Sequence, residues 1–171
     1  MVRLAIAVLF ACAVGVGHAS VRSEYELKAA FLFNFTRFVS WHEPPSDNPP
    51  LVVCVIGDNP FGDLLDPLIG KRSQGRDLEL NYVRDPSGIS ACNVLFISAS
   101  ESRNLSALLA LAQEYQVLTV SDIAGFVQAG GVIGYVQRGN VIRFEVNLAA
   151  AAANGLSVNS RLLELAARVT R

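Results

Sequence analysis

The residue types that could do chemistry in this chain are few, and each has a plainer explanation. His42 could serve as a catalytic base, but its Trp-His-Glu-Pro setting, without a Gly-x-Ser-x-Gly motif elsewhere, favours a solvated or capping histidine. The turn at 57–62 follows an apolar run, where a phosphate loop would lie, yet it lacks the full glycine pattern and carries Asp58. Lys71 and Arg72 belong to a glycine-bounded loop that no Gly-Lys-Ser/Thr motif follows. The sequence therefore predicts a protein that is not an enzyme and binds no metal or cofactor.

The N-terminus has the three-part layout of a secretory signal peptide. Residues 1–3 provide a short cationic start, residues 4–17 are almost wholly apolar, and small residues precede a cut between Ala19 and Ser20. The apolar run is too short for a lone membrane span, which needs about 20 residues. The residues before Cys12 loosely resemble a lipoprotein box, but a bulky side chain two positions earlier and a very short leader argue against lipid anchoring there. We expect an exported, periplasmic protein whose mature domain is 20–171.

Export changes how the cysteines are interpreted. Removal of the leader leaves Cys54 and Cys92, an even count in an oxidising compartment. If bridged, they enclose roughly 37 residues, a loop closure worth on the order of 3–4 kcal/mol. The alternative is two buried, unpaired thiols that act as small hydrophobes. Neither cysteine has further ligands at zinc-finger spacing, so a structural zinc site is not expected.

Composition and patterning predict one α/β domain. The chain has 171 residues, of which 51% are hydrophobic and 17% charged, with a formal net charge of −1. These values exclude disorder and give no global field that would attract nucleic acid. Apolar runs alternate with helical patterns, which predicts a mostly parallel sheet flanked by helices. Two closely spaced runs around residues 138–140 predict a C-terminal antiparallel hairpin.

The expected elements can be placed approximately. A capping box of Ser23 and Glu26 predicts the start of a first helix, which ends near the prolines at 44–45. The strands are expected at 51–56, 78–83, 93–98, 117–120, 132–137 and 141–147. The later helical segments are expected at about 61–69, 101–115, 121–128, 148–154 and 160–169.

Two polar features stand out from these elements. Asn34 and Arg37 lie one turn apart in the aromatic first helix, so both can face the same way. Alternation in the last expected strand places Arg143, Glu145 and Asn147 on one face. These five residues are either the wet faces of an amphipathic helix and a strand, or the lining of a ligand pocket or partner surface.

Several motifs in order resemble a known family. The motif that begins the expected mature domain reads Lys-Ala-Ala-Phe-Leu-Phe-Asn-Phe-Thr-Arg-Phe-Val-Ser-Trp, and the match continues through nearly the whole mature chain. The matching segments are 28–41, 54–62, 70–71, 92–98, 117–122, 130–133, 143–148, 155–156 and 161–163. This pattern resembles the YfiR family of periplasmic signalling proteins.

The resemblance implies regulation. Its members repress an inner-membrane diguanylate cyclase by binding the periplasmic region of that enzyme, and an OmpA-like outer-membrane lipoprotein can sequester the repressor. It further implies an α/β fold, homodimers and a disulfide, because Cys54 and Cys92 match one family pair in position. The second family pair, near the C-terminal hairpin, has no counterpart here, so a redox role that needs it is not expected.

An alternative from another class is a small periplasmic domain that binds an amino acid or a nucleotide-like compound. Asn34, Arg37, Arg143 and Asn147 would then line the pocket.

Overall fold

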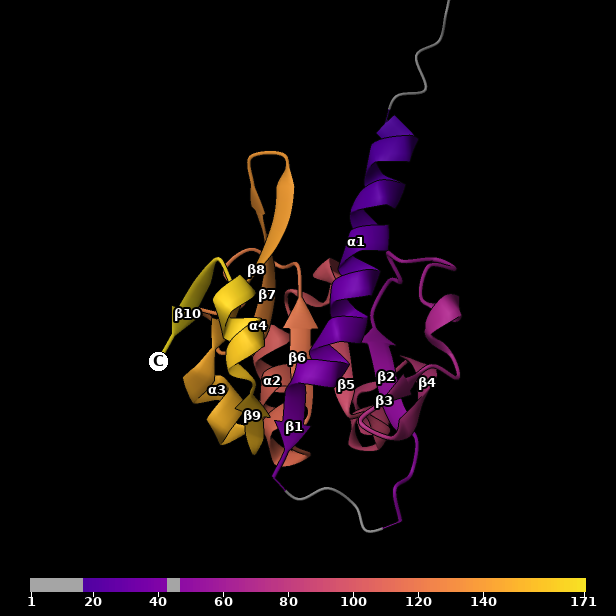
Figure 1. The fold of residues 1–171 in the computed structure, drawn as a ribbon, viewed down its shortest axis with the longest axis vertical. Coiled ribbons are helices and arrows are strands. Elements are labelled where there is room, and N and C mark those ends of the chain that lie inside the picture. Colours follow the sequence, from indigo (N-terminus) through magenta and orange to yellow (C-terminus); the bar gives the residue numbers. More distant parts are fainter. Residues whose placement is uncertain (1–16, 43–46) are drawn as a thin grey trace, which may run out of the picture.

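The continuous apolar runs of the sequence form the centre of one large sheet. In the computed structural model, which describes residues 17–42 and 47–171, eight strands lie in the order β10-β8-β7-β6-β5-β2-β4-β3 (Figure 1). The strands are β2 (Leu51–Ile56), β3 (Arg72–Ser73), β4 (Arg76–Val83), β5 (Val94–Ile97), β6 (Leu118–Ser121), β7 (Ile133–Arg138), β8 (Val141–Asn147) and β10 (Arg168–Thr170). Strands β2, β5 and β6 are almost fully buried, as continuous runs of Val, Ile and Leu predict.

Most neighbouring strands are parallel. The pairs β4–β2, β2–β5, β5–β6, β6–β7 and β8–β10 are parallel, whereas β7–β8 and β3–β4 are antiparallel. The β7–β8 pair is the expected hairpin, with Arg138 opposite Val141 and a two-residue turn at Gly139 and Asn140. Gly139 has a positive φ of 61°, which glycine adopts without strain. The predicted α/β fold with a C-terminal antiparallel hairpin is confirmed.

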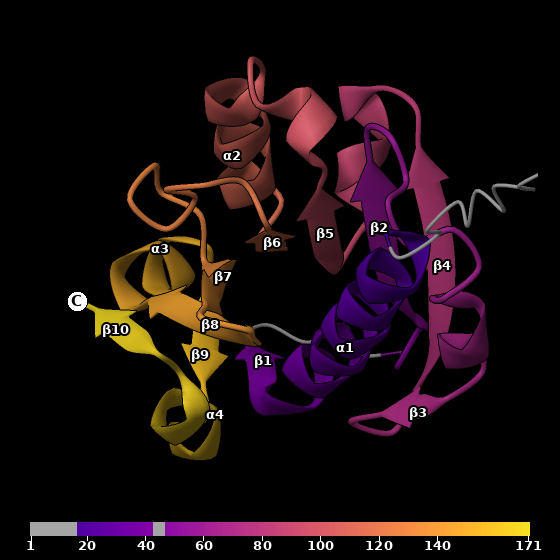
Figure 2. The same ribbon diagram turned by 90° about the horizontal axis from the view of Figure 1, so that it is seen from above.

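Helices cover both faces of the sheet. The helical segments are α1 (Gly17–Phe38), α2 (Leu105–Glu114), α3 (Leu148–Ala153), α4 (Ser160–Leu165) and the 3-10 turns η1 (Asp66–Leu68), η2 (Pro86–Ala91) and η3 (Ala99–Glu101). Figure 2 shows α1 on one side of β2, β4 and β5, with α2 on the other side. The described residues form two apolar cores: Phe35 and Phe96 belong to the larger one, on the α1 side, whereas Leu108, Cys54 and Cys92 belong to the smaller.

The first helix differs from the expectation at both ends. It begins at Gly17 and runs through Ser23, so Ser23 is not its N-cap, because nothing between residues 17 and 22 interrupts helix formation. It ends at Phe38, and β1 (Val39–Trp41) follows, paired antiparallel with β9 (Leu156–Val158) in a second, two-stranded sheet. The expected leader falls mostly outside the described residues, and its cleavage point lies in the first turn of α1.

Three other segments also differ. Residues 61–69 form turns and the short η1 rather than a helix, and Gly62 has a positive φ of 56°. Ser121, expected to cap a helix over 121–128, is instead the last residue of β6, and its hydroxyl donates to the Ile97 carbonyl. The chain continues from there in turns. The last helix ends at Leu165, after which β10 adds to the sheet beside β8.

None of the helices that the structure describes has both the length and the apolar character needed to cross a membrane.

Candidate functional site

The carboxyl ends of the central parallel strands meet α1 at one edge of the sheet. Ala99 lies two residues after β5 and Asp122 directly after β6, and residues of the N-terminal half of α1 line a cavity with both. In open α/β sheets, ligands bind outside the carboxyl ends of the strands, where the order of connection reverses. Here the order reverses between β2 and β5, since β4 lies on one side of β2 and β5 on the other, and the cavity described below adjoins this point at the ends of β5 and β6. This edge is therefore the first place to look for a site.

A buried lysine is the centre of this edge. Lys28 is only 4% exposed, and its ammonium Nζ lies 2.7 Å from Asp122 Oδ2 and 2.6 Å from Glu24 Oε1. The hydroxyl of Tyr25 donates to the same Asp122 oxygen at 2.7 Å. The Lys28 ammonium also lies 4.2 Å from the centre of the Tyr25 ring, within the range of a cation–π contact. We call Glu24, Tyr25, Lys28 and Asp122 the lysine cluster.

The surroundings of the lysine cluster favour protonated Lys28 and Tyr25. Burial alone would lower the pKa of Lys28, but hydrogen bonds to Asp122 and Glu24 and the charge of Asp122 outweigh it, so the pKa is raised. Burial, the hydrogen bond to Asp122 and the charge of Asp122 raise the pKa of Tyr25 to about 12. Lys28 thus remains an ammonium and Tyr25 a neutral phenol at physiological pH, which suits binding and positioning rather than nucleophilic attack.

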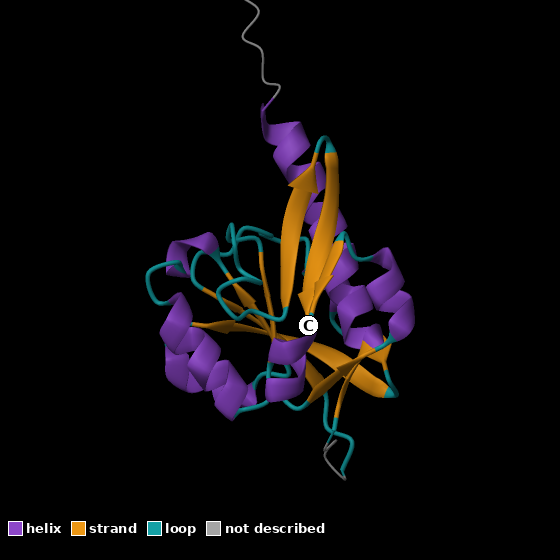
Figure 3. Cartoon of the chain, turned by 90° about the vertical axis from the view of Figure 1, so that its left-hand side faces the viewer, coloured by secondary structure: helices purple, strands orange, loops and turns teal. Residues whose placement is uncertain are grey.

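The β7–β8 hairpin forms the opposite wall. The hydroxyl of Tyr135 donates to the Lys28 carbonyl at 2.7 Å, and burial raises the pKa of this phenol well above its usual value. Above this contact the hairpin and the first turns of α1 extend beyond the rest of the molecule side by side (Figures 1 and 3). The base of the hairpin is therefore hydrogen-bonded to α1, whereas an open cavity separates its upper part from the helix.

A groove lies between α1 and the hairpin. Its inner cavity, about 300 Å³, is lined by the lysine cluster and by Ala99, Tyr135, Val136, Gln137 and Ile142. An outer cavity of about 430 Å³ shares Glu24, Gln137 and Ile142 with it and adds Ser23, Leu27, Asn140 and Val141. We call these two cavities together the α1–hairpin groove. Leu27 and Val141 are 41% and 56% exposed, so the outer groove presents apolar surface to solvent.

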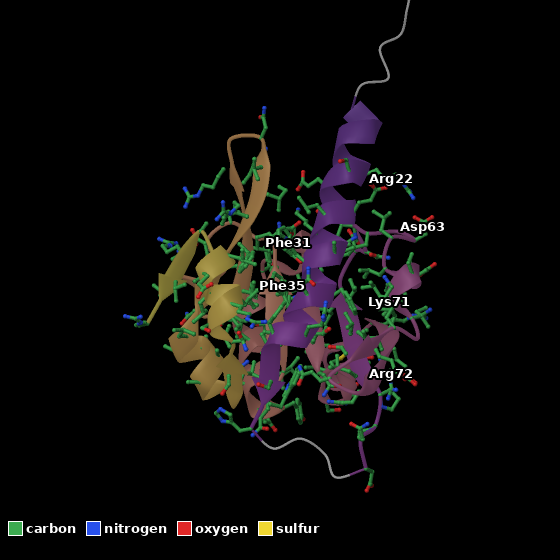
Figure 4. All side chains as sticks on the ribbon, in the orientation of Figure 1. Arg22, Phe31, Phe35, Asp63, Lys71 and Arg72 are labelled. Atoms are coloured by element: carbon green, nitrogen blue, oxygen red, sulfur yellow. A yellow bond between two sulfur atoms is a disulfide. The ribbon has the colours of Figure 1, made fainter. Side chains whose placement is uncertain are left out.

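A separate apolar hollow lies on the other side of α1. It is about 420 Å³, between Val21 and Tyr25 of the helix and the 60–64 turn, and the Arg22–Asp63 ion pair of 3.2 Å lies at its rim. Figure 4 shows Arg22 and Asp63 on this side, whereas Phe31 and Phe35 lie on the side that faces β7 and β8.

The predicted pair on α1 lies away from both cavities of the groove. Asn34 is half-buried, and Arg37 is exposed with its guanidinium 5.9 Å from the Phe33 ring and 6.0 Å from the Phe38 ring. Neither residue lines a cavity of the described chain that we identify. Their role in binding stays a prediction.

The predicted trio on β8 faces away from α1. Phe144 packs edge-on against Phe31 and Phe35 of α1, so alternation directs the side chains of Arg143, Glu145 and Asn147 to the opposite face. The side chains of this trio make hydrogen bonds and ion pairs with other residues of the same chain. Arg143 donates to the Leu165 carbonyl, Glu145 pairs with Arg138 and Arg168, and Asn147 caps α3 by accepting from the Ala150 N–H. The structure therefore does not bring the pair and the trio together, and their role as a partner face also stays a prediction.

The other candidate residues have simple environments. The Cys54–Cys92 disulfide is present, with a Cα–Cα distance of 5.9 Å, and joins β2 to the end of η2 on the α2 side of the sheet. His42 is exposed, and its Nε2 lies 2.8 Å from Ser157 Oγ. Within residues 17–42 and 47–171, no group of His, Cys, Asp and Glu is arranged to hold a metal ion.

The sequence interpretation missed the lysine cluster and Tyr135. The available signal was Lys28 itself, a charged residue one turn before Phe31 on the apolar side of the first helix. Its carboxylate partner Asp122 follows a buried strand more than 90 residues later, so no local pattern connects the two.

Comparison with solved structures supports the fold. A conserved domain protein from Vibrio cholerae O1 biovar El Tor is similar with a TM-score of 0.57 and 10% identity over 85% of this chain. A domain from Streptococcus pneumoniae described as an ABC domain in complex with L-Trp is similar with a TM-score of 0.53 and 9% identity over 81% of this chain. The chain spans 60% and 58% of these two structures, respectively, and at such identities the likeness concerns the fold alone. The search of curated proteins found no match.

The fold is an α/β domain with an internal disulfide and a groove between α1 and the β7–β8 hairpin. A family model described as YfiR/HmsC-like matches residues 25–167. The chain therefore belongs to the YfiR/HmsC-like family, as the sequence motifs indicate. This is a regulatory family of the periplasm that acts in diguanylate cyclase signalling, and the disulfide fits an oxidising compartment.

Proposed function

We propose that this protein is a periplasmic repressor that binds the periplasmic region of an inner-membrane diguanylate cyclase and thereby lowers cyclic di-GMP. The observation that carries the proposal is the family match over residues 25–167. A repressor of this kind needs higher affinity for the inactive than for the active conformation of the cyclase, since only differential affinity shifts an equilibrium. Sequestration by an OmpA-like outer-membrane lipoprotein and assembly as a homodimer are further parts of the proposal.

Cellular cyclic di-GMP tests this function. Deletion of the gene is expected to raise the nucleotide, and the full chain supplied in trans is expected to restore it. A matched control lacks residues 2–19, the proposed export signal, and should fail to restore the level although the domain is intact. An unchanged level in the deletion strain, under conditions where the protein is present in the parent, would contradict repression. Mass spectrometry of the exported protein checks the cleavage between Ala19 and Ser20.

The β8 trio offers a direct test of the predicted partner face. Arg143 is exposed, so Arg143→Glu reverses a surface charge while leaving the core intact. If this face binds the cyclase, the variant should bind its purified periplasmic region more weakly than the wild type does. Equal binding would remove this face from the proposal.

A second candidate function is binding of a small ligand such as an amino acid or a nucleotide-like compound. The inner cavity of the groove favours it, because Lys28, Glu24 and Asp122 offer both signs of charge beside two aromatic rings. The similar streptococcal domain was solved with L-Trp, which makes this amino acid a natural first probe. A ligand that binds tightly raises the melting temperature by mass action, so a thermal-shift screen of amino acids and nucleotides decides this alternative.

A further inference from the structure

Strand β7 continues well beyond the end of its neighbour β6. The parallel pairing between them comprises Val120 with Ile133 and Ser121 with Gly134, whereas β7 extends to Arg138. The ladder stops because the Ile123 N–H, next in line, donates to the Ser121 side-chain oxygen at 3.0 Å instead of to β7. The upper part of β7 is therefore an open sheet edge.

The alternation of the hairpin ladder shows which backbone groups lie at this edge. The Phe144 carbonyl accepts from the Ala167 N–H at 2.7 Å, so the polar groups of Phe144 point away from β7. Tyr135 is directly opposite Phe144, which makes this pair a non-hydrogen-bonded one. The Tyr135 carbonyl and the N–H and carbonyl of Gln137 thus point away from β8, past the end of β6. Within the described part of the chain, no strand pairs with them.

The edge opens onto a charged and partly apolar groove. Two carboxylates, Glu24 and Asp122, share the single ammonium of Lys28, which leaves one negative charge beside the inner cavity. Farther out, Leu27 and Ile142 provide apolar walls. A strand placed along the β7 edge would direct every second side chain into this groove. One of these side chains would lie against the carboxylates, and the one two residues along would lie against the apolar walls.

We propose that the open edge of β7 at Tyr135–Arg138, with the α1–hairpin groove, binds an extended segment of a partner protein that continues the sheet in line with β6. Main-chain hydrogen bonds supply the affinity, as in other cases of strand addition. A segment parallel to β7 would donate from one residue's N–H to the Tyr135 carbonyl and accept from the Gln137 N–H with that residue's carbonyl. The residual negative charge selects a Lys or Arg in the segment. This inference goes beyond the proposed function, because it holds whichever protein supplies the segment.

Two substitutions at one residue separate backbone from side-chain recognition. Gln137→Pro removes the N–H that points to the open edge, yet it removes no hydrogen bond to β8, and proline is tolerated on edge strands. Gln137→Ala removes the side chain and keeps the N–H, so it is the matched control. The probe is a phage-displayed library of random dodecapeptides, selected on the wild-type protein purified after export.

Selected peptides are expected to carry a basic residue at a fixed position. They should bind the Gln137→Pro variant at least about tenfold more weakly than the Gln137→Ala variant, a difference of roughly 1.4 kcal/mol that reports the backbone N–H separately from the side chain. In the wild-type protein, the Gln137 amide should become protected from hydrogen exchange when a selected peptide is bound. This last measurement keeps the proposal testable if the proline variant does not fold.

Three results would overturn the inference. They are failure of the library to enrich any peptide, equal binding of the selected peptides to the proline and alanine variants, and an unprotected Gln137 amide in the complex. A wild-type dimer that Gln137→Pro dissociates would identify a second copy as the occupant and would likewise overturn it. None of these measurements involves cyclic di-GMP, so their failure leaves the proposed repression standing, and the reverse also holds.

Discussion

Two buried charges of opposite sign lie on the two faces of the β7–β8 hairpin, and their surroundings differ. On the α1 face, Lys28 is held by Glu24 and Asp122, whose side chains are 35% and 14% exposed. On the opposite face, Glu145 is held by Arg138 and Arg168, whose side chains are 62% and 48% exposed. Loss of Lys28 would leave carboxylates partly inside the protein, whereas loss of Glu145 would leave its arginines in water. Each buried charge has two ion pairs, but the pairs of Lys28 should stabilise the fold more than the pairs of Glu145 do.

Replacement of Lys28 should have the largest effect on stability. Lys28→Met keeps most of the apolar stem but removes the cation that pairs with Asp122 and Glu24, and breaking such a buried pair costs about 3 kcal/mol. Urea denaturation of both proteins at neutral pH measures the difference. Glu24→Gln is the matched control, because Glu24 is the more exposed partner and its loss should cost less. Equal stability of Lys28→Met and wild type would show that the lysine cluster does not fix α1 to the sheet.

Replacement of Glu145 should have an intermediate effect. Glu145→Gln keeps the shape of the side chain but removes the charge that links the hairpin to β10, with an expected loss of about 1.5 kcal/mol. The loss should be local, so hydrogen exchange in β10 should increase more than exchange in β5. Uniform exchange changes across the sheet would argue that Glu145 supports the whole fold rather than this link.

Alkaline pH should weaken the Lys28 face selectively. The pKa of Tyr25 is raised to about 12 in the folded protein, so the folded state retains a proton that the unfolded chain releases near pH 10. The contribution of this proton to the free energy of unfolding is fully present below pH 10 and is lost as the pH rises toward 12. Lys28 contributes in the same direction, because its pKa is also raised in the folded protein. Tyr25→Phe should make the decline of unfolding free energy above pH 10 shallower. An identical slope in the variant would mean that Tyr25 does not contribute.

Removal of one exposed arginine should have the smallest effect. Arg138→Ala breaks an ion pair whose cation is largely in solvent, and such pairs contribute about 0.5 kcal/mol. Thermal unfolding at low and high salt is the measurement, and the difference from wild type should shrink as salt screens the pair. A loss as large as that of Glu145→Gln would show that Arg138 alone holds the carboxylate.

The parts of the fold that local sequence determines were predictable. Continuous β-branched runs gave the central strands, and the glycine turn at 139 gave the hairpin. Strands β9 and β10 were not predicted, because each has three residues and is a strand only through its pairing with β1 or β8. The lysine cluster escaped for the same reason: Lys28 and Asp122 meet only when α1 crosses the end of β6.

The contact between the Tyr135 hydroxyl and the Lys28 carbonyl joins residues 107 positions apart. A chain that emerges N-terminus first must therefore expose the aromatic face of α1 until the β7–β8 hairpin, which covers this face, has also emerged. Long-range closures of this kind slow folding and leave apolar surface open to aggregation. During the export proposed above, the protein should depend on a holding chaperone more than a helical protein of equal length does.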